Sequence, residues 1–279
     1  MVKGGVYTFA GVVENHAGMQ KIGVERDGLN KEDLKVIGAY FKEHGYKPTG
    51  IKLHNLIQGK QKKAYVLIVR RGSRAFGLKK NELFEEMKSV KPDKKFLNTR
   101  RKQVQNKNAR WNFNVADFEQ APSYEEGKGT VVSFENLQSL KKIREGLNKI
   151  GIPKIQNLLA EANVYHSEMS GIGFHGDSER KMVVGVNMGA KRVIEFQAFE
   201  HTLPVGKRLR IHLRDGDMYF MCTVACGNDW TSNGYRSLHY RHRAGYQKWL
   251  DRNERQNQTK WNKRKSSTTF QRRTKKRKI

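Results

Sequence analysis

The stretch Gly171-Ile172-Gly173-Phe174-His175-Gly176-Asp177-Ser178-Glu179-Arg180 contains the pattern that most constrains this chain. Residues two apart on a β-strand point to the same side, so His175 and Asp177 can reach one metal ion together. A second histidine from elsewhere would complete a set of two histidines and one carboxylate, which binds Fe(II) and leaves coordination positions open. An isolated His-x-Asp is a weak signal, so the prediction of a metal site depends on the surrounding sequence.

The composition indicates polyanionic partners. The 279 residues include 55 Lys and Arg against 27 Asp and Glu, a formal net charge of +28. Such a surface attracts nucleic acid in a salt-dependent way, and an acidic membrane surface is the weaker alternative. The two cysteines, Cys222 and Cys226, exclude a disulfide scaffold and predict an intracellular compartment, nucleus or cytoplasm. No apolar run approaches the roughly 20 residues of a membrane span, so we expect no membrane partner.

Residues 1–76 are predicted to form a small α+β unit. Val6–Val13 and Ala64–Val69 have the composition of strands. Between them, Asn30 supplies a cap before apolar residues at helical spacing. Further along the chain, Lys79–Val90 and Leu137–Ile150 predict two amphipathic helices.

From Val164 onward, short strands and turns are expected to dominate. Gly189, Pro204–Gly206 and Asp215–Asp217 separate the strand candidates. Several short strands at this spacing predict a β-sandwich or barrel, with the His-x-Asp pair at its entrance. The strand candidates are residues 182–186, 192–196, 209–213, 218–221 and 238–241.

Two basic segments extend the nucleic-acid interpretation. Lys91–Arg110 contains eight Lys and Arg and one Asp, and aromatic residues follow it. Cations interleaved with aromatic rings suit a nucleic-acid groove, although a solvated loop with Trp111 packed inward is the alternative. The tail 246–279 is predicted to be disordered when free and to act as a nuclear-import signal or nucleic-acid arm. The predicted nucleic-acid contacts are Arg100, Arg101, Lys102, Lys107, Arg110 and Trp111.

Further motifs occur in a defined order around the His-x-Asp pair. Asn163-Val164-Tyr165 precedes it, whereas Gly216-Asp217-Met218-Tyr219-Phe220-Met221 and then Leu238-His239-Tyr240-Arg241 follow it. Together these motifs resemble the AlkB-like family of Fe(II)/2-oxoglutarate dioxygenases over roughly residues 98–245. Ala109–Asn112 and Arg241–Gly245 look most like members encoded by large DNA viruses.

The resemblance implies a fold and a set of cofactors. The fold would be α+β, with a double-stranded β-helix (jelly-roll) dioxygenase core and flanking helices over residues 77–245. The chain would bind Fe(II), use 2-oxoglutarate as co-substrate and consume O2. Asn163 and Tyr165 would hydrogen-bond 2-oxoglutarate, and Arg241 would bind its distal carboxylate through a two-pronged contact. The alternatives are a salt bridge between strands for Arg241, and turn capping or core packing for the other two.

The third iron ligand departs from the family pattern. The family often places this histidine just past a Trp, but here Trp230 is followed by Thr231-Ser232. Strand alternation puts His239 on the same face as Arg241. The ending Arg-His-x-Ala-Gly favours His242, if a bulge or strand end re-aims it. We select His242, keep His239 as the alternative, and leave open a two-ligand or inactive site.

The expected function is oxidation of nucleic acid, by demethylating or hydroxylating a base. One alternative is a non-catalytic nucleic-acid-binding protein on a dioxygenase-like fold. Another is a hydroxylase of a protein side chain or a free nucleotide. High positive charge is expected on each interpretation, so it does not separate them.

Overall fold

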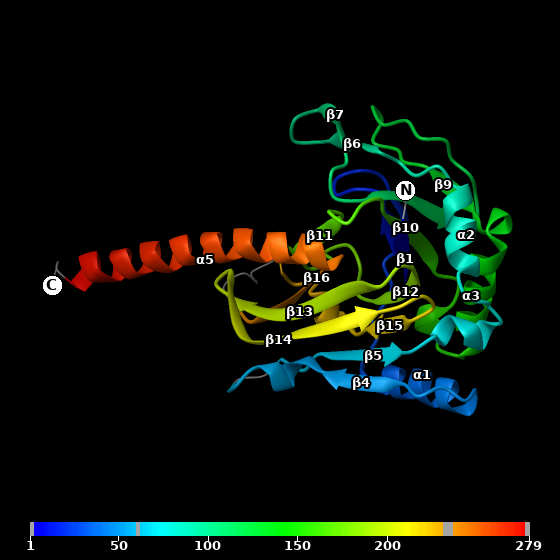
Figure 1. The fold of residues 1–279 in the computed structure, drawn as a ribbon, viewed down its shortest axis with the longest axis horizontal. Coiled ribbons are helices and arrows are strands. Elements are labelled where there is room, and N and C mark those ends of the chain that lie inside the picture. Colours follow the sequence, from blue (N-terminus) through cyan, green and yellow to red (C-terminus); the bar gives the residue numbers. More distant parts are fainter. Residues whose placement is uncertain (1–2, 60–61, 231–236, 277–279) are drawn as a thin grey trace.

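The computed structural model describes residues 3–59, 62–230 and 237–276, with side chains as far as residue 262. Two β-sheets dominate it (Figure 1). The larger sheet has eight strands in the order β4-β5-β15-β12-β1-β10-β8-β9, and the smaller has four in the order β11-β16-β13-β14. Neighbouring strands in the two sheets are antiparallel except for β8 and β9. The chain is therefore of the predicted mixed α+β class, with most strands in antiparallel sheets and few helices.

The strands of the larger sheet are β4 (Thr49–Lys52), β5 (Tyr65–Val69), β15 (Met218–Met221), β12 (Val183–Gly189), β1 (Gly4–Ala10), β10 (Leu159–Tyr165), β8 (Trp111–Ala116) and β9 (Val131–Ser133). Those of the smaller sheet are β11 (Gly171–His175), β16 (His239–Gly245), β13 (Arg192–Glu200) and β14 (Leu203–Leu213). Two hairpins are formed by β2 (Val12–Glu14) with β3 (Lys21–Gly23) and by β6 (Lys95–Asn98) with β7 (Gln103–Asn106). The helices are α1 (Lys31–Glu43), α2 (Glu82–Ser89), α3 (Gln138–Lys149), α4 (Thr223–Cys226) and α5 (Gln247–Lys276).

Apart from the β2–β3 hairpin, the described strands of the first 76 residues belong to the larger sheet. Strand β1 lies in the middle of the larger sheet, between β10 and β12. Strand β5 pairs with β15 from the far end of the chain. The predicted boundary at residue 76 therefore has no counterpart in the sheet. Local patterns identify a strand, but its partners depend on packing with distant segments.

The predicted helices form where the local signals placed them. Asn30 caps α1 through a capping box: its side chain accepts from the Asp33 amide at 2.9 Å, and the Asp33 carboxylate accepts from the Asn30 amide at 2.8 Å. Leu34, Ile37 and Phe41 then face the core on one side of the helix. Helices α2 and α3 occupy the predicted segments with slightly shorter ends.

The turn predicted at Pro204–Gly206 is wrong, because these residues lie inside β14. The chain instead reverses at His201 and Thr202, which both have positive φ. The β13–β14 register shifts between Phe196 and Ala198, so the pairing tolerates the irregular backbone there.

The tail also differs from its prediction. Composition indicated disorder, but residues 247–276 form helix α5, which projects from the body of the molecule (Figure 1). Its first part is anchored by buried Leu250 and Trp261 and by Arg243, which donates to Asn253 and Glu254. The few apolar residues are thus placed where the smaller sheet can bury them. None of the helices within the described ranges is long and apolar enough to cross a bilayer.

Candidate metal centre

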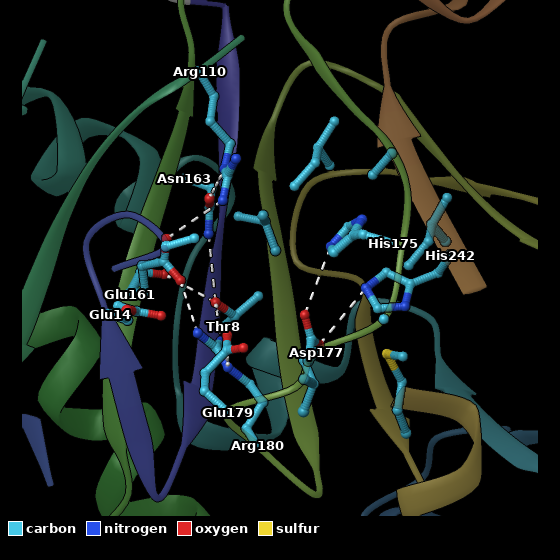
Figure 2. Close-up of a pocket in the computed structure, with 18 of the residues that line it drawn as sticks. Thr8, Glu14, Arg110, Glu161, Asn163, His175, Asp177, Glu179, Arg180 and His242 are labelled. Atoms are coloured by element: carbon cyan, nitrogen blue, oxygen red, sulfur yellow. Dashed lines mark hydrogen bonds and ion pairs between the residues drawn. The ribbon is translucent and has the colours of Figure 1, made fainter. Parts of the chain in front are cut away.

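A cavity of about 330 Å³ lies between the two sheets. Strands β1, β10, β12 and β15 form one wall, and β11, β13 and β16 form the other. Figure 2 shows two polar groups facing each other across it. His175, Asp177 and His242 lie on one side, and Glu161, Asn163, Arg110 and Arg180 lie on the other.

Three potential metal ligands converge in this cavity. His175 ends β11 and pairs in register with His242 on β16, whereas Asp177 lies just beyond the strand. His175 Nε2 is 3.6 Å from one Asp177 carboxylate oxygen, and His242 Nε2 is 3.7 Å from the other. One ligand atom from each residue lies within 4.8 Å of the other two. This spacing leaves room for one ion held by all three side chains.

Local backbone features aim these side chains. We expected a bulge or strand end near His242 on β16. The structure instead has the irregularity on the neighbouring strand β11, where the β11–β16 register shifts between Ile172 and His175. Gly176 allows the close turn to Asp177, because a Cβ there would lie 2.1 Å from the Gly227 carbonyl oxygen. The Asp177 amide then donates to the Cys226 carbonyl at 3.0 Å.

The protonation of the histidines suits a divalent metal. His175 Nδ1 lies 2.8 Å from the Gly173 carbonyl and so donates to it, which leaves the Nε2 lone pair facing Asp177. Burial, with smaller contributions from His175 and Arg180, lowers the pKa of His242 well below its ordinary value. His242 is therefore neutral at neutral pH, and its Nε2 can bind metal. A set of two imidazoles and one carboxylate fits Fe(II) with open positions.

The alternative ligand His239 lies on the other face of β16. Its ring stacks against Phe199, and its Nε2 accepts from Arg241 Nε at 3.0 Å. Arg241 lies over the rings of Phe199 and Trp230 and is not among the residues lining the cavity. The prediction that Arg241 binds the co-substrate is therefore wrong: it alternates with His242, so the two residues cannot face the same space. Thr231-Ser232, which follow Trp230 where the family often has a histidine, lie outside the described residues.

A different arginine lines the cavity. Arg192, at the start of β13, is 2% exposed. Its Nε donates to Asn187 at 3.0 Å and its Nη1 to the Tyr165 hydroxyl at 3.0 Å. Its Nη2 is buried and has no hydrogen-bond partner within the described part of the chain, and no described carboxylate pairs with the guanidinium. We did not predict a role for Arg192 from the sequence. Arg192 and Ile194 share one face of β13, but only the structure shows that this face lines the cavity.

Comparison with known proteins shows that this chain is similar to a viral protein. The chain is 34% identical over 249 residues to uncharacterized protein R156 of Acanthamoeba polyphaga mimivirus, covering 87% of this chain and 96% of that protein. The chain belongs to the family of this mimivirus protein. No model of a known protein family matches it. The relative has no assigned activity in its name, so the family membership leaves the chemistry to be argued from the site.

Asn163 and Tyr165 both line the cavity, as their shared strand face requires. Asn163 accepts from Arg110 Nε and donates to the Thr8 hydroxyl at 3.4 Å. Tyr165 is 1% exposed, and its hydroxyl accepts from Arg192. Both are thus placed where a cavity ligand can contact them.

Glu161, on the same face of β10, was not predicted. Arg180 approaches its carboxylate at 3.1 Å, and Asn112 donates to it at 2.9 Å. Burial raises the pKa of Glu161, but Arg180, Arg110 and Asn112 outweigh this and hold it below its ordinary value. The wall facing the three ligands therefore carries a buried, ionised carboxylate that is already paired.

The residues predicted to contact nucleic acid have different environments. Arg100, Arg101 and Lys102 are exposed in the turn between β6 and β7. Lys107 is 8% exposed and donates to Asn15 and Asn112, and burial lowers its pKa to about 8. Its prediction as a surface contact is wrong, because it neutralises a polar cluster inside the fold.

Arg110 and Trp111 also make contacts within the fold. Arg110 lines the cavity and contacts Glu161 at 3.7 Å. Trp111 is half-buried, with His166 stacked on its ring at 4.2 Å between centroids and Lys94 lying 4.3 Å from that ring. The described structure thus leaves the β6–β7 turn as the exposed part of this predicted groove.

His16 contributes to the cavity mouth. Its ring stacks on Phe96 of β6 with 3.6 Å between centroids, and it also lines the cavity. Burial is the main cause that lowers its pKa to about 4. The β6–β7 hairpin is thereby tied to the edge of the candidate site.

Proposed function

We propose that this chain is an Fe(II)/2-oxoglutarate-dependent dioxygenase. The observation that carries the proposal is the presence, in one cavity, of the His175–Asp177–His242 cluster and of the Arg192 guanidinium, which has no carboxylate partner among the described residues. The cluster fits Fe(II), and a buried cation without a carboxylate partner requires an anion. A dicarboxylate whose other end is a keto acid satisfies both requirements. The cavity volume of about 330 Å³ is also typical of small-molecule sites.

The strand arrangement supports a jelly-roll core for this enzyme. A jelly roll packs eight strands into two sheets. Here β11-β16-β13-β14 faces the central strands β15-β12-β1-β10 across the cavity. In the proposed core, β1 would supply one of the eight strands from the start of the chain. That strand carries Val6 and Thr8 into the cavity but no cation. Of the arginines that line the cavity, Arg110 and Arg180 contact Glu161, so Arg192 of β13 is the one left for a ligand carboxylate.

The residues of the chain would divide the work as follows. His175 and His242 would offer neutral nitrogen lone pairs, and Asp177 would offer one negative charge to the ion. Arg192 would bind the distal carboxylate of 2-oxoglutarate, beside the Tyr165 hydroxyl that Arg192 already orients. When bound, Fe(II) supplies the oxidative chemistry that converts 2-oxoglutarate, O2 and a substrate C–H bond into succinate, CO2 and a C–OH group. The two sheets would exclude water from this reaction.

Nucleic acid is the substrate class that the charge favours. The net charge of +28 and the exposed Arg100, Arg101 and Lys102 support a polyanionic substrate. These three residues lie in the turn of the β6–β7 hairpin, whose Phe96 stacks on the cavity-lining His16. A target base would have to leave its stack or come from a single strand. If an N-methyl group is hydroxylated, the product loses formaldehyde and the bare amine remains. We also propose that this chain is encoded by a large DNA virus, and its mimivirus relative supports this proposal.

Turnover tests the proposal. The protein, loaded anaerobically with Fe(II) and 2-oxoglutarate, should give a weak visible charge-transfer band, and O2 should then release succinate. Methylated oligonucleotides should stimulate this release more than peptides do. Asp177→Ala should abolish both the band and succinate release, whereas His239→Ala should retain them.

Two outcomes would reject the proposal in different ways. If Asp177→Ala leaves nucleic-acid affinity intact and wild-type protein shows neither band nor succinate, the chain is a binding protein. If a peptide alone stimulates 2-oxoglutarate consumption, the oxygenase assignment stands and the nucleic-acid substrate is wrong.

A further inference from the structure

We propose that a groove between helix α1 and strand β4 binds an extended, acidic segment of a partner protein. The groove has a volume of about 390 Å³ and is separate from the candidate metal centre. Strand β4 ends the order of the larger sheet, so one of its edges has no neighbour among the described strands (Figure 1). A peptide can add to such an edge as a further strand, with alternate side chains entering an adjoining pocket.

The lining of the groove combines an apolar floor with a cationic rim. Leu34 of α1 and Leu67 of β5 are buried and line the floor. The residues that line the groove include no Asp or Glu. An extended peptide with alternating apolar and acidic residues would match this pattern, because one face would enter the groove and the other would reach cations. The lysines of the lining are Lys31, Lys35, Lys42 and Lys52.

Two glycines in the groove lack an explanation in the fold. Gly38 lies inside α1, where glycine is unfavourable, yet an added Cβ would meet only ordinary contacts at 3.9–4.0 Å. Gly50 is exposed on β4, and an added Cβ would meet nothing within 4 Å. Neither glycine has positive φ. Glycine inside a strand is typical of sites where another backbone approaches closely. Both glycines therefore leave space in the groove, although glycine is unfavourable in a helix and in a strand.

Charge selects among the possible occupants. A second copy of the chain would bring another +28 to the same lysines, which opposes pairing of two β4 edges. A nucleic acid would match the lysines but would leave the apolar floor of Leu34 and Leu67 without a partner. An acidic segment with alternating apolar residues complements both features.

Defined peptides test this surface. A fluorescent eight-residue peptide of alternating Glu and Val should bind saturably, with a dissociation constant below about 1 mM that rises with salt. A Lys-Val peptide of the same length should not bind. Gly50→Ile should weaken binding at least about tenfold while leaving the melting temperature unchanged or higher, because isoleucine favours strands and fills open space.

Thr49→Ile is the matched control, because the neighbouring exposed side chain points to the other face of β4. It should leave peptide affinity unchanged. The proposal is overturned if the Glu-Val peptide does not bind, or binds Gly50→Ile as well as wild type. It is also overturned if a fatty acid or single-stranded oligonucleotide displaces the peptide with higher affinity, or if Gly50→Ile abolishes a dimer of the free chain.

Discussion

The two faces of strands β13 and β16 contrast sharply in how their polar groups are satisfied. On the outer face, Glu195 is fully buried and accepts from Arg243 at 2.5 Å and from Arg210 at 2.6 Å. On the inner face, His242 Nδ1 and Arg192 Nη2 are buried without hydrogen-bond partners in the described part of the chain. Buried polar groups in folded proteins are generally paired. The buried carboxylate of the outer face is therefore paired within the chain, whereas the two buried nitrogens of the inner face have no partner among the described residues.

The largest expected effect lies on the outer face. Arg243→Met keeps much of the side-chain volume but leaves Glu195 and Glu254 with fewer cationic partners. Breaking a buried ion pair from one side costs about 3–5 kcal/mol, so urea unfolding should show a loss of this size. Arg241→Met on the same strand is the matched control and should cost less than about 1 kcal/mol. Equal losses for the two variants would remove the contrast between the faces.

The inner face should respond in metal affinity. His242→Ala deletes a ligand of the proposed centre and should weaken Co(II) or Fe(II) binding at least about 100-fold, because even second-shell changes reduce affinity about 10–100-fold. His239→Ala, on the opposite face, should leave the affinity within about threefold. Anaerobic calorimetric titration measures both. A larger effect of His239→Ala would move the third ligand to that residue.

Arg192 should separate ligand binding from stability. Arg192→Met should weaken 2-oxoglutarate binding about 10–150-fold, because hydrogen bonds to charged groups contribute about 1.5–3 kcal/mol. The same change removes a buried cation but also the donors to Asn187 and Tyr165, so the free energy of unfolding without ligand should fall by no more than about 1–3 kcal/mol. Titration of 2-oxoglutarate and urea unfolding give the two values. Unchanged affinity together with lost stability would make Arg192 a structural residue.

The smallest expected effect is on pH dependence. The pKa of His16 falls from an ordinary 6.5 to about 4, mainly through burial, and the pKa of His242 is lowered in the same direction. Between these values the unfolded chain binds protons that the folded chain does not, so stability should fall as pH decreases from about 6.5 towards about 4. His16→Phe, which can retain the stack on Phe96, should show a shallower decrease between pH 7 and pH 5 in urea unfolding. An unchanged slope would show that His16 titrates normally.

The sequence predicted the local parts of this picture well. The His175-x-Asp177 pattern and the helix cap at Asn30 depend on short-range spacing, whereas the choice of His242 depends on the family resemblance and goes against simple strand alternation. The structure has each group at the expected position. Family resemblance also drew attention to Asn163 and Tyr165, which line the cavity. Whether these residues bind iron and 2-oxoglutarate stays a prediction.

The parts that failed depend on long-range pairing. No local pattern could show that β1 lies between β10 and β12, or that Arg192 faces the cavity. The alternation of Arg241 with His242, in contrast, is visible in the sequence. Lys107 was misassigned because charge composition does not reveal burial. The tail was misassigned because so few apolar residues mark α5, and their partners lie on the smaller sheet.

A crystal structure grown anaerobically with Mn(II) and 2-oxoglutarate tests the central claim most directly. The account predicts one ion within about 2.0–2.3 Å of His175 Nε2, an Asp177 oxygen and His242 Nε2, with the distal carboxylate of 2-oxoglutarate paired to Arg192. An ion held elsewhere, or a carboxylate that leaves Arg192 without a partner, would contradict it.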